Sequence, residues 1–294
     1  MPGTDRNKAI GGLIVAAFLF GATFVVVKSA LQDIGPLSFV AWRFLIGAVV
    51  LAAFAIPKGR TLWRHGALTG LALFAGYALQ TGGLVLSSAS NSALITGLYV
   101  VFTPFLAAAF KRRPPSPWVV SAAAVSFVGL FLLTDTDGLS LESGDLLTLG
   151  CALAFAAHIV ILARYARHHP VIPFTTVQLM VTAALAFPTA FLIEGPGLPP
   201  SSVYGALALT GLGVSAGAFM LQVWAQTVIG PNTAAVVLAA EPAFGVAVAW
   251  ASLGERLDTA GWIGAGLIVV AIYVVITKQR DDSFREAEAV TPAH

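Results

Sequence analysis

Two charged residues lie deep within apolar stretches of the sequence, where an ionised side chain is energetically expensive. Glu241 is about nine residues, or ~13 Å of helix, into the stretch that begins at Asn232. A carboxylate at this depth requires a water-filled cavity, a proton or a partner. Glu241 is therefore a candidate to bind a substrate cation or a proton, and the alternative is a hydrogen bond between packed helices. Arg43 is about seven residues, or roughly 10 Å, into another apolar stretch. It is a candidate to bind a substrate carboxylate, or to hold helices together through backbone carbonyls.

Uncharged polar side chains at similar depth form a second set of candidates for a binding cavity. They are Tyr77, Gln80, Thr96, Tyr99, Thr103, His158, Gln178 and Gln222. Each also has a structural interpretation, because such side chains often hydrogen-bond across packed membrane helices. Pro104 and Pro242 interrupt two apolar stretches. A proline removes a backbone donor and permits a kink, so both are candidate hinges.

The composition identifies the environment of these residues. Hydrophobic residues make up 57% of the 294 and charged residues 10%, with a mean hydropathy of +0.86. A soluble domain has about 25% charged residues, so this chain cannot cover a globular surface in water. The net charge of +2 excludes a nucleic-acid partner. The one cysteine, Cys151, excludes an intramolecular disulfide and a multi-cysteine metal site. We expect an integral membrane protein without a metal or another cofactor.

Ten stretches are long and apolar enough to cross a bilayer core of about 30 Å as helices. They run approximately over Ala9–Ala30, Pro36–Ile56, His65–Leu86, Asn91–Phe110, Pro117–Thr134, Asp145–Tyr165, Ile172–Ile193, Ser202–Thr227, Asn232–Ser252 and Thr259–Thr277. With the N-terminus placed in the cytoplasm, thirteen of the 16 basic residues fall on the inside. The positive-inside rule therefore predicts that both termini are cytoplasmic.

The ten stretches divide into two groups of five at an acidic segment, Asp135 to Asp145. Phe20, Phe39 and Phe44 precede Phe155, Phe174 and Leu179 by 135 positions, while Gly70, Gly76 and Asn91 precede Gly211, Gly217 and Asn232 by 141. Chance likeness in a chain rich in Ala, Gly and Leu is the alternative to a repeat. Duplicating an odd number of spans inverts the second copy. The sequence thus predicts an all-α membrane protein with inverted repeats over 1–138 and 139–280 and a cytoplasmic tail over 281–294.

Several runs of residues carry a resemblance to a known family. They are SASNSALITGLYVVFTP over Ser88–Pro104, Glu241-Pro242 followed by Gly254-Glu255, and Arg43-Phe44 after Pro36. From about Ala9 to Thr277 the chain resembles the drug/metabolite transporter superfamily, specifically its ten-helix EamA-type exporters. One departure is Lys111-Arg112-Arg113, which stands where a Gly-Glu pair is often found in the first repeat. The resemblance implies a central cavity within the third, fourth, eighth and ninth spans, flanked by the first, second, sixth and seventh.

The expected function is secondary transport across the bacterial inner membrane by alternating access. No Gly-x-x-x-x-Gly-Lys-Ser/Thr segment occurs, so energy must come from gradients. The resemblance implies export of amino acids, aromatic and other neutral ones favoured, or of related metabolites. The alternative is an exporter of nucleosides, sugar nucleotides or drugs, and a channel or receptor is the reading from a different class. An enzyme is not expected, because Glu241 is the only acid at membrane depth. The expected partners are a small-molecule substrate and membrane lipid, with protons as the candidate coupling ion.

Overall fold

The computed structural model of the chain is helical throughout the residues that it describes, which are 2–86, 95–112, 114–133, 144–241, 243–245, 247–248 and 258–290. Its α-helices are α1 (Pro2–Ala22), α2 (Phe24–Ala30), α3 (Pro36–Phe54), α4 (Arg60–Val85), α6 (Tyr99–Lys111), α7 (Pro117–Leu133), α8 (Asp145–Tyr165), α9 (Val171–Glu194), α10 (Tyr204–Leu209), α11 (Phe219–Val228), α12 (Pro231–Leu238) and α14 (Thr259–Val290). Short 3₁₀ segments cover Ala166–His168 and Ser201–Val203, and a π-helix, η3, covers Thr210–Ala218.

Most predicted stretches coincide with helices, and four differ in detail. The ninth stretch begins in α12, which ends at Leu238, before Glu241. Helix α8 begins at Asp145 and ends at Tyr165, as predicted. The first stretch is not one helix, because a break at Thr23 separates α1 from α2, and the Thr23 hydroxyl donates to the carbonyl of Leu19 at 2.9 Å. The eighth stretch contains the π-helix between α10 and α11. The last helix runs on to Val290, because the charged residues after Thr277 include good helix formers.

Four helical segments among the described residues are long and apolar enough to cross a membrane. They are Pro36–Phe54, Asp145–His168, Val171–Glu194 and Ser201–Val228. Shorter apolar helices cover Ile95–Phe110, Pro117–Leu132 and Thr259–Val275. The chain is thus an all-helical protein with several membrane-spanning segments, and the count of ten and the cytoplasmic location of the termini stay predictions.

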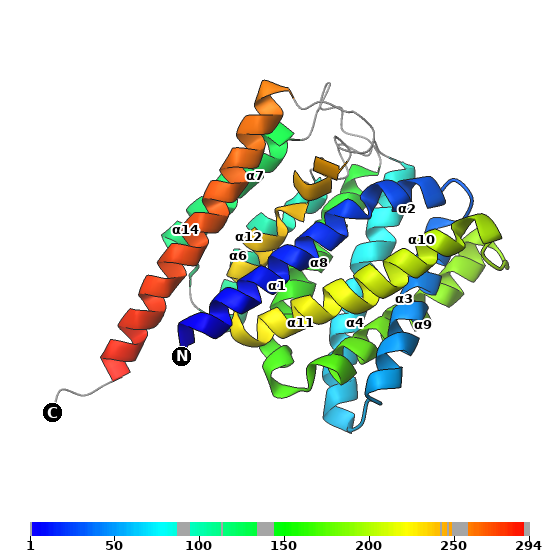
Figure 1. Ribbon diagram of the computed structural model, residues 1–294, viewed down its shortest axis with the longest axis horizontal. Helices are drawn as coiled ribbons and strands as arrows, with labels where there is room; N and C mark the ends of the chain where they lie inside the picture. Colours follow the sequence, from blue (N-terminus) through cyan, green and yellow to red (C-terminus); the bar gives the residue numbers. More distant parts are fainter. Residues whose placement is uncertain are drawn as a thin grey trace.

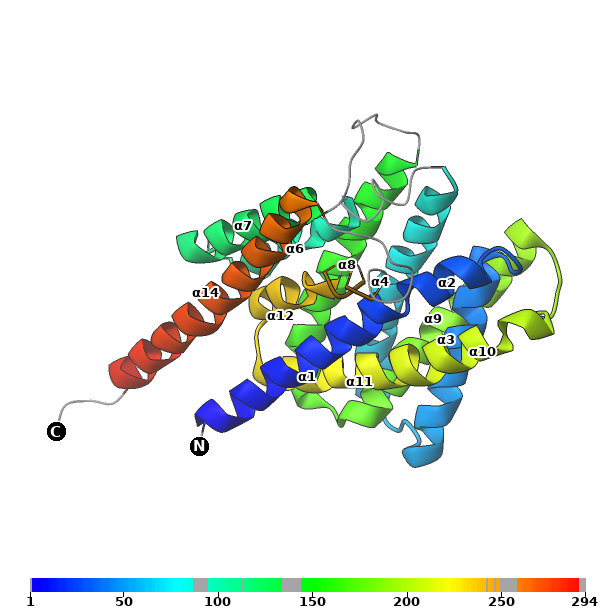
Figure 2. The ribbon, with the colours of Figure 1, turned by 45° about the horizontal axis from the view of Figure 1, so that its top comes forward.

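The buried residues form two main core clusters, and one pair of helices packs together at an edge of the molecule. Helices α7 and α14 lie side by side at that edge, while α1 lies against α11, and α3 against α9 (Figure 1). The N-terminus and the end of α14 lie at the same end of the molecule in both views (Figures 1 and 2). One core cluster joins α1, α6, α8 and α12, and a second joins α3, α4 and α9. Phe20 and Phe155 pack against both clusters, which places them at the boundary.

Close approach between helices depends on glycines at particular positions. A Cβ atom on Gly70 of α4 would lie 2.7 Å from the carbonyl oxygen of Gln178 in α9. A Cβ atom on Gly47 of α3 would lie 2.7 Å from the Cβ of Ser215 in η3. These contacts leave no room for a side chain, so the two pairs of helices touch through their backbones.

A carboxylate connects α9 to the N-terminus of α3. Glu194 accepts hydrogen bonds from the backbone N–H groups of Leu37 (2.7 Å) and Ser38 (2.9 Å) and from the Ser38 hydroxyl (2.6 Å). The first N–H groups of a helix have no partner within the helix and carry partial positive charge. Glu194 therefore caps α3 from another helix, and we refer to this contact as the Glu194 cap.

Two histidines meet where α4 approaches the connection between α8 and α9. His65 Nδ1 lies 2.8 Å from His169 Nε2, and the His65 ring stacks on Tyr165. A hydrogen bond between two imidazoles requires that one of them accept, so at least one is neutral. Burial, together with the nearby His65 and His168, lowers the pKa of His169 below its ordinary value of 6.5.

Candidate functional site

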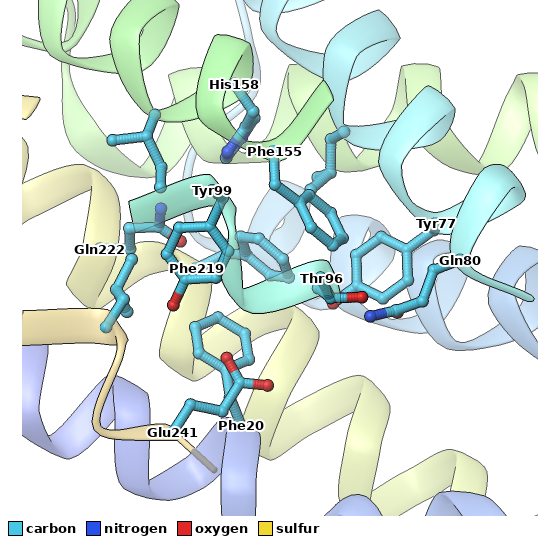
Figure 3. A pocket seen from close by; sticks show the side chains of 13 residues that line it. Phe20, Tyr77, Gln80, Thr96, Tyr99, Phe155, His158, Phe219, Gln222 and Glu241 are labelled. Carbon is cyan, nitrogen blue, oxygen red and sulfur yellow. The ribbon is translucent and has the colours of Figure 1, made fainter. Parts of the chain in front are cut away.

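A cavity lies where α1, α4, α8 and α11 converge with α6 and the segment that follows α12 (Figure 3). Its lining residues are Phe20, Leu73, Tyr77, Gln80, Thr96, Tyr99, Phe155, His158, Ile159, Phe219, Gln222, Leu238 and Glu241. Both halves of the chain contribute to the wall. Its surface combines aromatic rings with a few polar groups, which is the usual character of a small-molecule site.

Seven of the residues predicted to form a site lie in this wall. They are Tyr77, Gln80, Thr96, Tyr99, His158, Gln222 and Glu241. Three others, Arg43, Thr103 and Gln178, are buried outside the wall. Of the two candidate hinges, Pro104 lies inside α6, while Pro242 is outside the described residues.

Glu241 is the one carboxylate of the cavity wall. Its side chain lies beside Phe20, facing the space between the aromatic rings (Figure 3). No hydrogen bond or close ion pair joins its carboxylate to another described residue, and the charge of Arg43 acts on it from behind the wall. The electrostatic field of Glu241 reaches Tyr77 and Tyr99. An acceptor of this kind is available to a ligand.

Arg43 lies behind the wall, where its guanidinium has several partners. The side chain is 5% exposed, and its Nε donates to the Ser215 hydroxyl at 3.3 Å. The guanidinium carbon is 5.2 Å from the ring centroid of Phe44 and 5.3 Å from that of Tyr77. Tyr77 faces the cavity, so Arg43 acts on the wall through this ring.

His158 and Gln178 form a hydrogen-bonded pair at the side of the cavity formed by α8. His158 Nε2 lies 3.1 Å from Gln178 Oε1, and both side chains are buried. The Gln178 Nε2 atom is buried without a partner among the described residues. This pair fits the structural interpretation of Gln178 as a link between helices, and it leaves His158 facing the cavity (Figure 3).

A second chain of amides extends from the wall into the protein. Gln222 Nε2 donates to Gln226 Oε1 at 3.4 Å, and Gln226 Nε2 donates to the carbonyl of Ile159 at 2.9 Å. Sequence reasoning missed Gln226, although it lies one helical turn after Gln222. Thr103 donates to the Tyr99 carbonyl of its own helix at 2.7 Å, so its hydroxyl is satisfied away from the cavity.

Sequence reasoning also missed the aromatic part of the wall. Phe20, Phe155 and Phe219 line the cavity, with Phe20 and Phe219 in edge contact at 5.1 Å between centroids. The available signal was the 135-residue spacing between Phe20 and Phe155, which places equivalent residues of the two halves at one site.

One sequence pattern that resembles a hydrolase motif has no such role. Gly213-Val214-Ser215-Ala216-Gly217 has the spacing of a nucleophile elbow, which requires a strand followed by a helix. These residues lie inside the π-helix, and Ser215 is fully buried against Arg43. Among the described residues no cluster of three or more His, Cys, Asp or Glu could hold a metal ion.

The structure thus combines apolar helices long enough to cross a membrane with a mixed aromatic and polar cavity suited to a small molecule. The profile of the EamA-like transporter family matches residues 7–135 and again residues 142–277. The chain therefore belongs to the EamA-like transporter family, and it is a multi-pass protein of the cell inner membrane.

Several relatives are similar over nearly their whole length. An uncharacterized transporter of Archaeoglobus fulgidus is 32% identical, with 93% of this chain and 87% of that protein aligned. The uncharacterized transporter YwfM of Bacillus subtilis is 26% identical over 94% of this chain and 96% of that protein. The uncharacterized inner membrane transporter YedA of Escherichia coli is 24% identical over 90% and 89%.

One solved crystal structure has the same fold. It aligns with a TM-score of 0.81 at 21% sequence identity and covers 94% of this chain and 99% of that chain.

Proposed function

We propose that this transporter exports amino acids, with aromatic and other neutral ones favoured, by alternating access through the cavity around Glu241. The observation that carries the proposal is the carboxylate of Glu241, which has no hydrogen-bond partner among the described residues and lies in a wall of aromatic rings, phenols and amides. An amino acid needs an acceptor for its ammonium group and an apolar wall for its side chain, and the cavity supplies both. A sugar nucleotide would require several cationic groups for its phosphates, and no Lys or Arg is among the described residues that line this cavity.

Alternating access between inverted repeats is supported by the way helices of the two halves pack. Helix α4 packs on α8 and α9, and the continuous helix of α10, η3 and α11 packs in the corresponding way on α1 and α3. The pairs α3 with α9 and α7 with α14 join helices at equivalent places in the two halves. A two-fold relation between 1–138 and 139–280 accounts for this pattern, and the two profile matches support the same division.

Counterflow in proteoliposomes tests the proposal. Vesicles loaded with unlabelled phenylalanine should accumulate labelled phenylalanine with saturable kinetics, above protein-free vesicles. Flux of nucleosides or sugar nucleotides without amino-acid flux would support the alternative exporter class. Flux that does not saturate would indicate a channel.

Protons are the candidate coupling ion, and Glu241 is the group proposed to exchange them. Glu241→Gln keeps the shape and hydrogen-bonding capacity of the side chain but cannot exchange a proton. We expect the folded variant to lose the pH dependence of flux. Asp33→Asn, an acid-to-amide change at an exposed position, is the matched control. Unchanged pH dependence in Glu241→Gln would assign Glu241 to structure.

A further inference from the structure

The charged side chains of the cavity suit the ammonium end of an amino-acid substrate better than its carboxylate end. Among the described residues of the lining, Glu241 alone is an acid, and no Lys or Arg is present. The position 138 residues before Glu241, which the Pro104 and Pro242 spacing makes equivalent, is Thr103, whose hydroxyl bonds its own helix. The wall therefore presents one negative group and no positive side chain of fixed charge.

The nearest candidate for binding a carboxylate is held out of reach. Arg43 is 5% exposed, its Nε bonds Ser215, and its guanidinium lies against the rings of Phe44 and Tyr77. Arg43 is not among the described lining residues, and its charge acts on Tyr77 and Glu241 from behind the wall, so a ligand in this cavity meets those side chains and not the guanidinium. The residue 135 positions later, at the equivalent place in the second half, is Gln178, which is uncharged and also lies outside the wall.

The neutral donors of the wall do not replace a countercharge. Gln222 already donates to Gln226, and Tyr77, Tyr99 and Gln80 offer uncharged hydrogen bonds. Moving a carboxylate out of water costs several kcal/mol unless it gains a partner of opposite charge. In this cavity a substrate carboxylate would also meet the repulsion of Glu241.

An ammonium group meets the opposite conditions. The carboxylate of Glu241 is available to it and lies beside the ring of Phe20, and the rings of Tyr99 and Phe219 line the same cavity (Figure 3). Aromatic faces attract cations, and the attraction increases when both are removed from water. Among the described lining residues, the carboxylate and the aromatic rings thus both favour a positive ligand.

Resting on the proposed function, we propose that this cavity recognises the ammonium group of its substrate and not the carboxylate. Organic amines that lack a carboxylate then bind at least as tightly as the amino acids with the same side chain. The substrate class of the site is thus primary amines with an apolar or aromatic side chain, of which neutral amino acids are one part.

Four compounds with one phenyl skeleton separate the two recognition elements. Phenylalanine carries both the amine and the carboxylate, phenylalaninol only the amine, 3-phenylpropionate only the carboxylate, and 3-phenylpropanol neither. Each is titrated as a competitor of labelled phenylalanine binding to the detergent-purified full chain at pH 6.5, where the amines are protonated. We expect phenylalaninol to bind at least as tightly as phenylalanine, and about 10-fold or more tighter than 3-phenylpropionate.

Glu241→Gln provides the second measurement, with Asp33→Asn as the matched control. In Glu241→Gln the affinity for phenylalaninol should fall to that for 3-phenylpropanol, whose affinity should not change. Unchanged 3-phenylpropanol binding also shows that the variant is folded. In Asp33→Asn all four affinities should equal those of the original chain.

The possible outcomes separate the two proposals. Tight phenylalanine binding with phenylalaninol at least about 10-fold weaker would show that the carboxylate is recognised. That result overturns the inference and leaves the proposed function in place. Phenylalaninol that binds equally in Glu241→Gln and in the original chain also overturns the inference. Failure of all four compounds to bind would overturn the inference and the proposed amino-acid substrate together.

Discussion

The Glu194 cap makes a quantitative prediction about the contact between α9 and α3. Glu194→Ala removes the acceptor of three hydrogen bonds that the start of α3 donates, two of them from backbone N–H groups without a partner in the helix. Loss of a helix cap costs about 0.5–2 kcal/mol, and loss of a charge near a helix N-terminus about 0.3–1 kcal/mol. Because Glu194 is partly exposed, solvent screening limits the sum. We expect a decrease of about 1–2 kcal/mol in the free energy of unfolding.

Gly35 allows this value to be checked by a double-mutant cycle. A Cβ atom on Gly35 would occupy the place of the Glu194 carboxylate, whereas the backbone of Gly35 (φ −59°, ψ 141°) suits any residue. Gly35→Ala should therefore expel the carboxylate and cost as much as Glu194→Ala. In the Glu194→Ala background the same methyl group should cost nothing further. The coupling energy of the cycle should be about 1–2 kcal/mol.

Unfolding of the purified protein in mixed micelles with increasing dodecyl sulfate measures these free energies. Asp33→Asn is the control, because it removes the negative charge of an exposed side chain that accepts a hydrogen bond from the Ser202 hydroxyl at 2.7 Å, at the same end of α9 and α3. It should change the free energy by no more than about 0.5 kcal/mol. Additive effects of Gly35→Ala and Glu194→Ala, or an Ala variant at position 194 as stable as the original chain, would refute the reasoning.

Three further predictions concern packing, pH and topology. Gly70→Ala should lower the free energy of unfolding by about 1–3 kcal/mol, because its methyl group meets the α9 backbone. Gly82→Ala in the same helix should not, because its methyl group would have ordinary contact distances, and equal effects of the two changes would contradict the packing. Because the folded state lowers the pKa of His169, stability should be full above pH 6.5 and fall as the pH drops below that value, with a smaller fall in His169→Gln; melting temperatures from pH 8 to 5 check the sign. In a Cys151→Ala background, cysteines at Ser140 and Pro57 should react with an impermeant maleimide from opposite faces of the membrane, and equal labelling in intact cells would exclude the inverted ten-span topology.

The positions of the helices along the chain could be predicted because length and hydropathy determine them. Pro36, Pro117 and Pro231 begin helices where the sequence suggested boundaries, as expected from the fixed φ of proline. The break at Thr23 and the π-helix could not be predicted, since neither changes the hydropathy of its stretch. Both depend on hydrogen bonds within an apolar segment.

The sequence predicts how deep a candidate site residue lies along its helix, but not toward which side of the helix its side chain points. Sequence position gives the distance of a residue along the helix axis, and this was sufficient to select Glu241, Tyr77 and Gln222. Helices that are apolar on all sides carry no sign of which face is inward. Arg43 and Gln178 lie at suitable depth but outside the cavity wall, and the sequence carries no signal that would show this. Phe20 could not be distinguished among 19 phenylalanines.

The π-helix affects which residues of the two halves are matched with each other under the predicted repeat. Gly70 and Gly211 are 141 positions apart, whereas the cavity residues Gln80 and Gln222, one helical segment later, are 142 apart. Gly211 lies within η3, which ends at Ala218, before Gln222, and a π-helical turn accommodates about one residue more than an α-helical turn. Under the predicted repeat, one extra residue in η3 accounts for the difference between 141 and 142. A gapless alignment of the halves at a spacing of 141 would pair Gln222 with Thr81, whereas the glutamines that line the cavity are Gln80 and Gln222.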